Sequence, residues 1–258
     1  NGTTGYEEAA GQGVLAGLNA ARFALGAEPW VPGRDEAFLG VLVDDLVTRG
    51  VDEPYRLFTS RAEFRLLLRQ DNALERLGPV AAELDLLEDD ELRMLDRRLA
   101  ETGRLRAWIE DRSVEPAEVD AYLSAAGSAP LAQKVPLAKL LLRPEVRLGE
   151  LVGPEGPLGG EGFEADALAT VEMDIKYEGY IQRDRDRAGA LRRREAVPLA
   201  ADLPYAAFDS LSREAREKLA EVRPATLGQA GRIPGISPAD LQNLLVEVRK
   251  RRRAEVSA

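Results

Sequence analysis

The sequence contains no cysteine and no histidine, and aromatic residues make up only 5% of its 258 residues. Disulfide frameworks, thiol nucleophiles, imidazole bases and the usual zinc sites are therefore excluded. There is no nucleotide-binding fingerprint of the GxGxxG or GxxxxGK(S/T) type, and no pair of carboxylates is spaced for acid–base catalysis. We consequently predict no catalytic and no metal-ligating residue in this chain.

The sequence also has no signal peptide and no apolar run long enough to span a membrane, which predicts a cytoplasmic protein without a membrane partner. Its formal net charge of -10 argues against a general attraction to nucleic acid, so any contact with RNA must come from local basic segments. Leu, Ala, Glu and Arg dominate the composition. Because these straight-chain residues lose little rotamer freedom in a helix, we predict a mainly α fold.

Hydrophobic periodicity and start signals predict a succession of helices. Thr4 and Glu7 have the spacing of a capping box, and Ser237 and Pro238 have the residue types of an N-cap and a first helical position. We predict three regions, 1–75, 76–162 and 163–258, with a Gly- and Pro-rich linker at 153–162. The predicted helices cover residues 3–23, 35–48, 84–109, 116–125, 131–142, 163–194, 211–222, 226–233 and 237–253.

The segment 54–72, PYRLFTSRAEFRLLLRQDN, is the strongest candidate for contact with RNA. Its guanidinium groups could hold phosphates, and Tyr55, Phe58 and Phe64 could stack on unpaired bases. An ion-paired stripe on an amphipathic element explains the pattern about equally well, and periodicity does not decide between an extended and a helical backbone. The arginines concerned are Arg56, Arg61, Arg65 and Arg69.

Three further segments have a functional and a structural interpretation. The helix start at residues 2–8 could hold an anion, but an ordinary capped helix is favoured. The basic stretch 176–194, which contains Tyr177 and Tyr180, is more typical of a solvated charged face. The two short helices around the Pro-Gly turn of RIPGISPADLQ resemble a phosphate-gripping hairpin, although a plain packing unit is favoured.

Five stretches, in this order, resemble the GidA/MnmG family of flavin-dependent tRNA-modifying enzymes. They are NGTTGYEEAAGQGVLAGLNAAR, EPYRLFTSRAEFRLLLRQDNA, IKYEGYIQR, LSREAREKL and RPATLGQAGRIPGISPADLQNLLVEV. The resemblance spans the chain, although residues 78–170 contribute little beyond helical character. It predicts a C-terminal fragment: the last corner of an α/β FAD-binding domain in residues 1–75, then a helical C-terminal domain.

The resemblance implies an activity for the whole enzyme. Together with the GTPase MnmE, the family installs aminomethyl-type groups, such as carboxymethylaminomethyl, at C5 of the wobble uridine (position 34) of tRNA. FAD and NADH supply the redox chemistry, methylene-tetrahydrofolate supplies the one-carbon unit, and the enzyme is a homodimer. This chain would contribute tRNA and partner binding and would be inactive in isolation. The alternative is a stand-alone helical interaction module or a helix-hairpin-helix binder of nucleic acid.

The resemblance also assigns roles to individual residues. The start of the first helix, Gly2, Thr3, Thr4 and Gly5, resembles a flavin-proximal segment of the FAD domain. Arg56 and Arg65 match basic residues implicated in tRNA binding, whereas Arg61 and Arg69 are added here because of their charge. Glu214, in LSREAREKL, matches a position linked to activity and is interpreted as a docking or structural residue. Phe64 stands where the family commonly has tyrosine.

Overall fold

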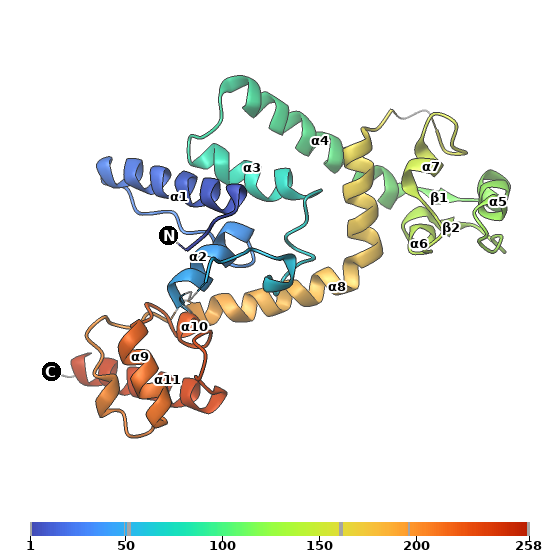
Figure 1. Cartoon of the computed structure of the whole chain (residues 1–258). Coiled ribbons are helices and arrows are strands. Elements are labelled where there is room, and N and C mark those ends of the chain that lie inside the picture. The colour runs from blue at the N-terminus through green and yellow to red at the C-terminus, as the bar shows by residue number, and fades with distance from the viewer. Residues whose placement is uncertain (1, 49, 51–52, 160–161, 196, 257–258) are drawn as a thin grey trace. The chain divides into compact units, whose positions relative to one another are not determined.

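The computed structural model describes residues 2–48, 50, 53–159, 162–195 and 197–256. Within these ranges the regular structure is helical apart from a two-stranded antiparallel sheet, β1 (Ser113–Val114) and β2 (Val135–Pro136) (Figure 1). The prediction of a mainly α fold is therefore confirmed.

The chain divides into two compact units. The first unit combines Asn1–Leu67 with Asp184–Ala258, and the second consists of Leu68–Arg183. This division differs from the predicted boundaries after residues 75 and 162. The first half of α8 (Ala165–Glu195) belongs to the second unit because Ala167 and Val171 are buried in that unit's apolar core.

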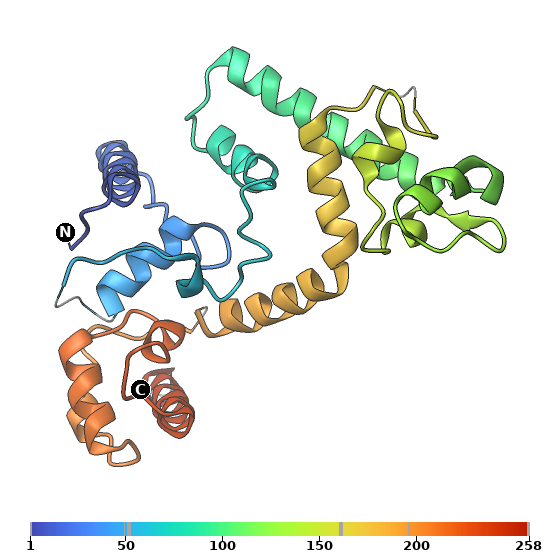
Figure 2. The same ribbon diagram turned by 45° about the vertical axis from the view of Figure 1, so that its right-hand side comes forward.

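The second unit is built on one continuous apolar cluster. Leu105, Ile109, Leu123, Leu140 and Leu148 are almost fully buried in it. In two views, α5, α6 and α7 gather beside the C-terminal part of α4 (Figures 1 and 2). The helices of this unit, besides the first half of α8, are α3 (Ala73–Glu83), α4 (Asp89–Asp111), α5 (Pro116–Ala125), α6 (Leu137–Leu141) and α7 (Leu148–Val152).

Capping residues and turns set the ends of the helices in the second unit, and the sequence predicts these ends only in part. Capping boxes of Glu88 with Glu91 and of Glu115 with Glu118 start α4 and α5. The predicted helix 84–109 is wrong at its start, because the chain turns between α3 and α4. Of the predicted helix 131–142, only α6 forms. The described part of the predicted linker 153–162 folds back on α7, and its Leu158 joins the core.

The N-terminal part of the first unit contains α1 (Tyr6–Ala24), α2 (Phe38–Thr48) and the single 3-10 turn η1 (Thr59–Arg61). The predicted capping box of Thr4 and Glu7 is wrong. The backbone is still extended at Thr3, which forms a parallel bridge with Tyr55, so the helix starts only after Gly5. The segment 54–72 is neither a strand nor a long helix, since irregular backbone surrounds η1.

The C-terminal part of the first unit is a small helical bundle with its own apolar cluster. Leu219 and Leu244 are completely buried there, together with Tyr205. The bundle consists of η2 (Tyr205–Ala207), α9 (Arg213–Val222), α10 (Leu227–Ala230) and α11 (Pro238–Val256), which lie side by side in both views (Figures 1 and 2).

The start of α11 confirms the predicted N-cap. The N–H of Asp240 donates to Oγ of Ser237 at 3.1 Å, and Pro238 is the first helical residue. The Asp240 carboxylate also accepts from the backbone N–H of Ser212 at 2.8 Å, which ties α11 to the start of α9. Burial opposes its charge, but hydrogen bonds from Ser237 and Ser212 lower the pKa of Asp240.

Candidate functional site

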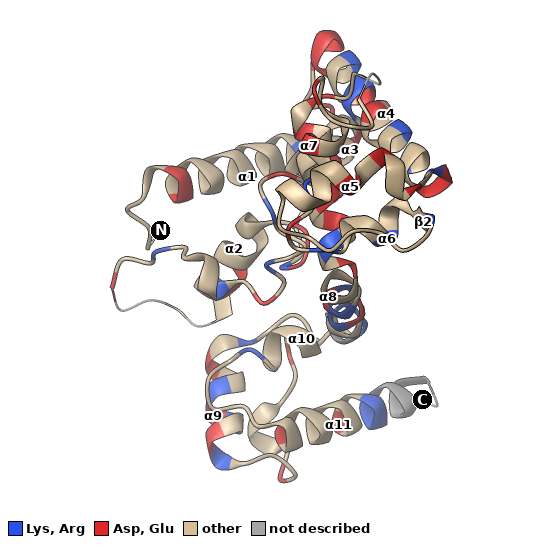
Figure 3. Cartoon of the chain, turned by 90° about the vertical axis from the view of Figure 1, so that its right-hand side faces the viewer, with Lys and Arg blue, Asp and Glu red and all other residues tan. Residues whose placement is uncertain are grey.

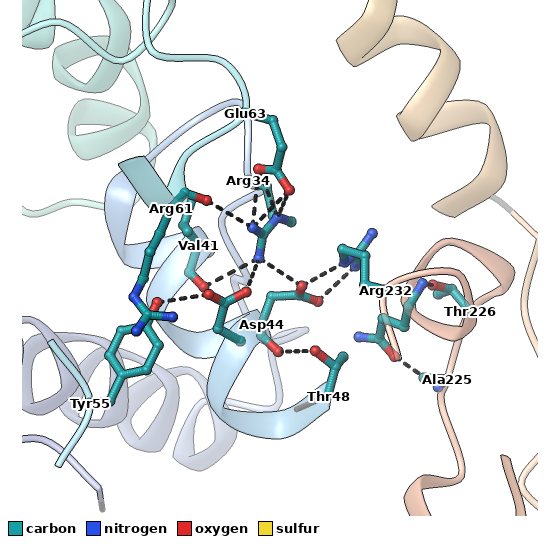
Figure 4. A network of polar contacts seen from close by, with 12 residues as sticks. Arg34, Val41, Asp44, Thr48, Tyr55, Arg61, Glu63, Ala225, Thr226 and Arg232 are labelled. Atoms are coloured by element: carbon teal, nitrogen blue, oxygen red, sulfur yellow. Dashed lines mark hydrogen bonds and ion pairs between the residues drawn. The ribbon is translucent and has the colours of Figure 1, made fainter. Parts of the chain in front are cut away.

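A buried arginine organises the N-terminal part of the first unit. Arg34 precedes α2, and its side chain is only 3% exposed. Its Nη1 donates to Asp44 at 2.9 Å and to Asp45 at 2.7 Å, and its Nε and Nη2 grip both carboxylate oxygens of Glu63 (Figure 4). We call Arg34, Asp44, Asp45, Glu63 and Arg232 the buried ion network.

Arg232 connects the buried ion network to the C-terminal bundle. It follows α10, and its Nε and Nη2 donate to the two oxygens of Asp44 at 2.6 and 2.7 Å (Figure 4). Both side chains of this bidentate pair are about nine-tenths buried. Asp44 is therefore shared by two guanidinium groups from distant parts of the sequence, one preceding α2 and one in the bundle.

Charge and burial compete within this network. Burial opposes the charge of Arg34, but its hydrogen bonds to Glu63 and Asp45, and the negative charges of both, raise the pKa of Arg34. The Tyr55 hydroxyl donates to Asp45 at 2.8 Å, and burial together with this carboxylate raises the pKa of Tyr55. Arg34 therefore keeps its charge and Tyr55 its proton at neutral pH.

Sequence reasoning missed the buried ion network, although one signal was present. Asp44 and Asp45 are adjacent in the otherwise apolar helix FLGVLVDDLVT. Two acidic residues on an apolar helix require buried cations, because an unpaired buried carboxylate is costly. The partner Arg232 lies in RIPGISPADLQ, the segment that resembles a helical hairpin. Its guanidinium group pairs with Asp44 inside the fold.

The predicted arginine segment presents three of its four cations to solvent. Arg56, Arg61 and Arg65 are exposed, and so is Phe58, whose residue is 58% accessible. Of the three aromatic residues predicted to stack, Tyr55 and Phe64 are each only 5% exposed, so only Phe58 is open to a ligand. We refer to Arg56, Phe58, Arg61 and Arg65 as the arginine surface.

Local contacts fix the geometry of the arginine surface. Arg61 Nε donates to the carbonyl of Arg56 at 2.9 Å, and its guanidinium lies 4.4 Å from the ring centroid of Tyr55. Arg56 forms a long ion pair of 3.8 Å with Glu8. Within the described residues, no carboxylate lies within ion-pair distance of Arg61 or Arg65. Arg34 holds Glu63, the one acid between Arg56 and Arg65 in the sequence, so the surface keeps a net positive charge.

The fourth arginine does not belong to this exposed set. The Arg69 side chain is only 8% exposed and lies in the second unit. Its Nη2 donates to Asp71 at 3.0 Å and to Asp174 of α8 at 2.6 Å. The expectation that Arg69 shares an exposed cationic surface is therefore wrong, because its guanidinium is used to hold α8 within its own unit.

The predicted flavin-proximal segment is already occupied by an internal anion. Thr3 Oγ1 accepts from Gln12, and the carbonyl of Gly2 accepts from the N–H of Tyr55. Hydrogen bonds from the backbone N–H groups of Glu8 itself and of Leu57 lower the pKa of Glu8. Its carboxylate lies over Gly5, where a phosphate would otherwise approach the helix start. The segment 2–5 thus does not fit a phosphate.

The predicted docking residue Glu214 lies in the first turn of α9. It is exposed, and among the described residues no cation lies within ion-pair distance of it. Its carboxylate rests on the Pro-Gly turn of the bundle, so a Cβ on Gly235 would come within 2.3 Å of Oε1. Gly235 has a φ of +93°, a value that also favours glycine. Along α9, with Glu214 included, basic and acidic residues alternate (Figure 3).

Other kinds of site are poorly supported in the part of the chain that the structure describes. No group of acidic residues there could hold a metal ion, and none of its helices is long and apolar enough to cross a bilayer. The second unit has a groove of about 630 Å³, lined by Phe163 and Leu168 among others. Of its three charged residues, Arg147 and Glu172 are paired at 3.3 Å, and Glu150 accepts from the hydroxyl of Tyr122 at 3.0 Å.

Comparison with known families gives consistent matches along the chain. Residues 65–185 match the tRNA modifying enzyme MnmG/GidA C-terminal helical domain, and residues 187–257 match the C-terminal helical bundle of the same enzymes. Residues 1–28 match the family named glucose inhibited division protein A. The first two ranges contain the two apolar clusters described above.

Individual relatives agree with the family matches. The chain is 46% identical to the tRNA uridine 5-carboxymethylaminomethyl modification enzyme MnmG of Roseiflexus sp. (strain RS-1) over 98% of its own length and 37% of the relative. It is 43% identical to the enzyme of that name from Flavobacterium psychrophilum, covering 95% of this chain and 40% of the relative.

A solved structure supports the same relationship. The form II crystal structure of Aquifex aeolicus GidA is similar with a TM-score of 0.78 and 38% identity, over 96% of this chain and 38% of that one. The chain thus spans about two-fifths of the length of the relatives it matches.

Proposed function

The chain belongs to the MnmG/GidA family of tRNA-modifying enzymes, and from this premise we propose that it supplies tRNA binding and partner docking to the whole enzyme. That enzyme installs carboxymethylaminomethyl groups at C5 of the wobble uridine of tRNA. The observation that carries the proposal is the arginine surface, where three exposed guanidinium groups accompany an exposed phenylalanine.

The chemistry of the arginine surface suits a folded RNA. Arginine recognises phosphate bidentately and keeps its charge at any physiological pH, and Phe58 offers a ring on which an unpaired base can stack. Glu63, which lies between Arg61 and Arg65 in the sequence, is bound by Arg34, and the ion pair of Arg56 with Glu8 is long, at 3.8 Å. Local excess charge of this kind attracts tRNA even though the chain as a whole is acidic.

The proposal predicts a loss of tRNA affinity when two of these cations are removed. In the full-length enzyme, Arg56→Ala with Arg65→Ala should lower the salt dependence of binding, because each lost phosphate contact reduces the slope of log K against log salt by about 0.9. Titration of labelled tRNA at several salt concentrations measures this slope.

A matched control distinguishes the effect of the arginine surface on tRNA binding from the effect of losing any two positive charges. Arg93→Ala with Arg97→Ala removes the same charge from two exposed positions on α4 and should leave the slope unchanged. If both double variants bind tRNA like the wild type at fixed salt, the arginine surface does not contact tRNA. The chain would then act in partner docking alone.

We propose that Glu214 docks the GTPase partner, MnmE in this family. An exposed carboxylate without a cationic partner, at the start of a helix in a compact bundle, is available to a basic group of another protein. Replacement by glutamine keeps the side-chain shape and removes only the charge.

Glu214→Gln should weaken the complex with the GTPase at least roughly tenfold, since a close charge pair at an interface contributes more than about 1.4 kcal/mol. Isothermal titration of the GTPase into the full-length enzyme measures the affinity. Glu217→Gln is the matched control, because Glu217 lies on the same helix but already pairs with Arg213 at 2.9 Å. Equal affinities of the two variants would exclude Glu214 from the interface.

The remaining parts of the family activity we assign to the whole homodimeric enzyme. FAD, when bound, supplies the redox chemistry together with NADH, and methylene-tetrahydrofolate supplies the carbon unit. From this chain, we propose that the backbone of Gly2, Thr3, Thr4 and Gly5 contacts an uncharged part of the flavin. Glu8 excludes phosphate from this helix start, because its carboxylate already accepts the nearby N–H groups.

A further inference from the structure

A second surface with aromatic and basic character lies on α8. Tyr177 is 39% exposed and Tyr180 is 57% exposed, and their ring centroids are 6.4 Å apart. The guanidinium of Arg183 lies 4.5 Å from the centroid of Tyr180. Residues three positions apart are neighbours on a helix, so these side chains form one face, which we call the tyrosine face.

Local contacts fix the position of Arg183 on this face. Arg183 Nε donates to the carbonyl of Gly179 at 3.0 Å, which directs the guanidinium back along the helix over Tyr180. The space where Gly179 would carry a Cβ is empty, although glycine inside a helix costs about 1 kcal/mol relative to alanine. Sterically, alanine would fit at position 179, so packing does not explain the glycine.

The charge of Arg183 is available to a ligand. Within the described residues, no carboxylate lies within ion-pair distance of it, and the residue is exposed. By contrast, Lys176 on the same helix is bound by Glu172 at 3.0 Å and by the carbonyl of Val146 at 2.6 Å. The tyrosine face thus combines two accessible aromatic rings with one uncompensated cation.

These features favour nucleic acid over protein as the occupant. The centre of a protein interface is a contiguous apolar patch, but the other exposed residues between positions 177 and 183 are Glu178, Gly179 and Gln182. Single-stranded nucleic acid needs only stacking rings and a nearby cation for the phosphate, and stacking tolerates a polar rim. Among the described residues of α8, the exposed large hydrophobic side chains are these two tyrosines.

We propose that the tyrosine face is a stacking platform for unpaired nucleotides of RNA, with Tyr177 and Tyr180 contacting bases and Arg183 contacting the adjacent phosphate. The inference rests on the proposed function in so far as the whole enzyme handles tRNA. It adds a second contact, on α8, that is separate in sequence from the arginine surface.

The test compares two double variants of the full-length enzyme. Tyr177→Leu with Tyr180→Leu keeps an apolar side chain but removes the aromatic faces, whereas Tyr177→Phe with Tyr180→Phe keeps the faces and removes only the hydroxyls. The probes are a labelled anticodon stem-loop and a fully paired RNA duplex of equal length. Loss of each stacked base should weaken stem-loop binding roughly five- to hundredfold in the leucine variant. The phenylalanine variant should bind like the wild type, and duplex binding should change little in either.

Each alternative result overturns the proposal in a recognisable way. Unchanged stem-loop binding by the leucine variant excludes stacking, and an equal loss in both double variants would indicate a role of the hydroxyls instead. Loss of GTPase binding with normal RNA binding would make the face a protein-docking surface. The arginine variants report on the proposed function independently, because their salt slope on intact tRNA does not depend on the tyrosines. Thermal unfolding of each variant controls for folding.

Discussion

Replacing Arg34 by methionine should lower the free energy of unfolding of the first unit by about 3–5 kcal/mol, because it removes the cation that Asp44, Asp45 and Glu63 share. Asp45 is only 1% exposed and Asp44 only 11%, so water cannot take over the lost interactions. Methionine fills a similar volume, and the loss therefore reports on charge rather than on a cavity. Denaturant unfolding together with amide hydrogen exchange of α2 measures the change.

Two further variants make the result specific. Arg65→Met is the same substitution at an exposed arginine without an ion pair among the described residues, and it should change the stability by less than about 0.5 kcal/mol. Adding Asp45→Asn to Arg34→Met should recover part of the loss, because it removes one of the stranded charges. Equal small effects of Arg34→Met and Arg65→Met would show that the buried ion network contributes little to stability.

Truncation of Leu244 to alanine should destabilise the C-terminal bundle by about 2–5 kcal/mol. The side chain is completely buried among the residues around Leu219 and Tyr205, so the substitution removes apolar contacts and leaves a cavity. Because the chain has two separate apolar clusters, the effect should appear in hydrogen exchange of α9 and α11 but not of α4 and α5.

The controls for this prediction lie on the same helix and in the other cluster. Val246→Ala, at a position that is 48% exposed, should change stability by less than about 0.5 kcal/mol. Leu140→Ala should give a loss of similar size to that of Leu244→Ala, but confined to the second unit. If Leu244→Ala accelerated exchange equally in both units, the two clusters would have to unfold together.

Helices that begin at a capping residue or a proline within their own sequence could be predicted. The predicted helix at 116–125 agrees with α5, since Pro116 suits a first helical position, and the Ser237 cap is present as predicted. The capping box of Thr4 failed although its spacing was right. A distant residue, Tyr55, pairs with the chain at Gly2 and Thr3 and holds it extended, and Glu8 takes over the nearby N–H groups.

The candidate site was predictable only in part, because the sequence does not reveal which arginines form buried ion pairs and which remain exposed. Arg69 resembles its neighbours in sequence, but its partner Asp174 lies 105 residues away on α8. Arg34 was not singled out in the sequence, yet it binds Glu63, the acid that lies between Arg61 and Arg65 in the sequence. Pairings at such separations have no periodic or local signature, so only the three-dimensional structure assigns them.

The sharing of Asp44 between Arg34 and Arg232 has a consequence for how the protein is made. About 200 residues separate the two arginines, which corresponds to roughly 10–40 s of synthesis at a ribosomal rate of about 5–20 residues per second. The second unit is continuous in sequence and lies entirely between these two residues. On the ribosome, residues 68–183 are therefore synthesised before Arg232, and Asp44 of α2 lacks its second guanidinium partner until Arg232 has been added to the chain.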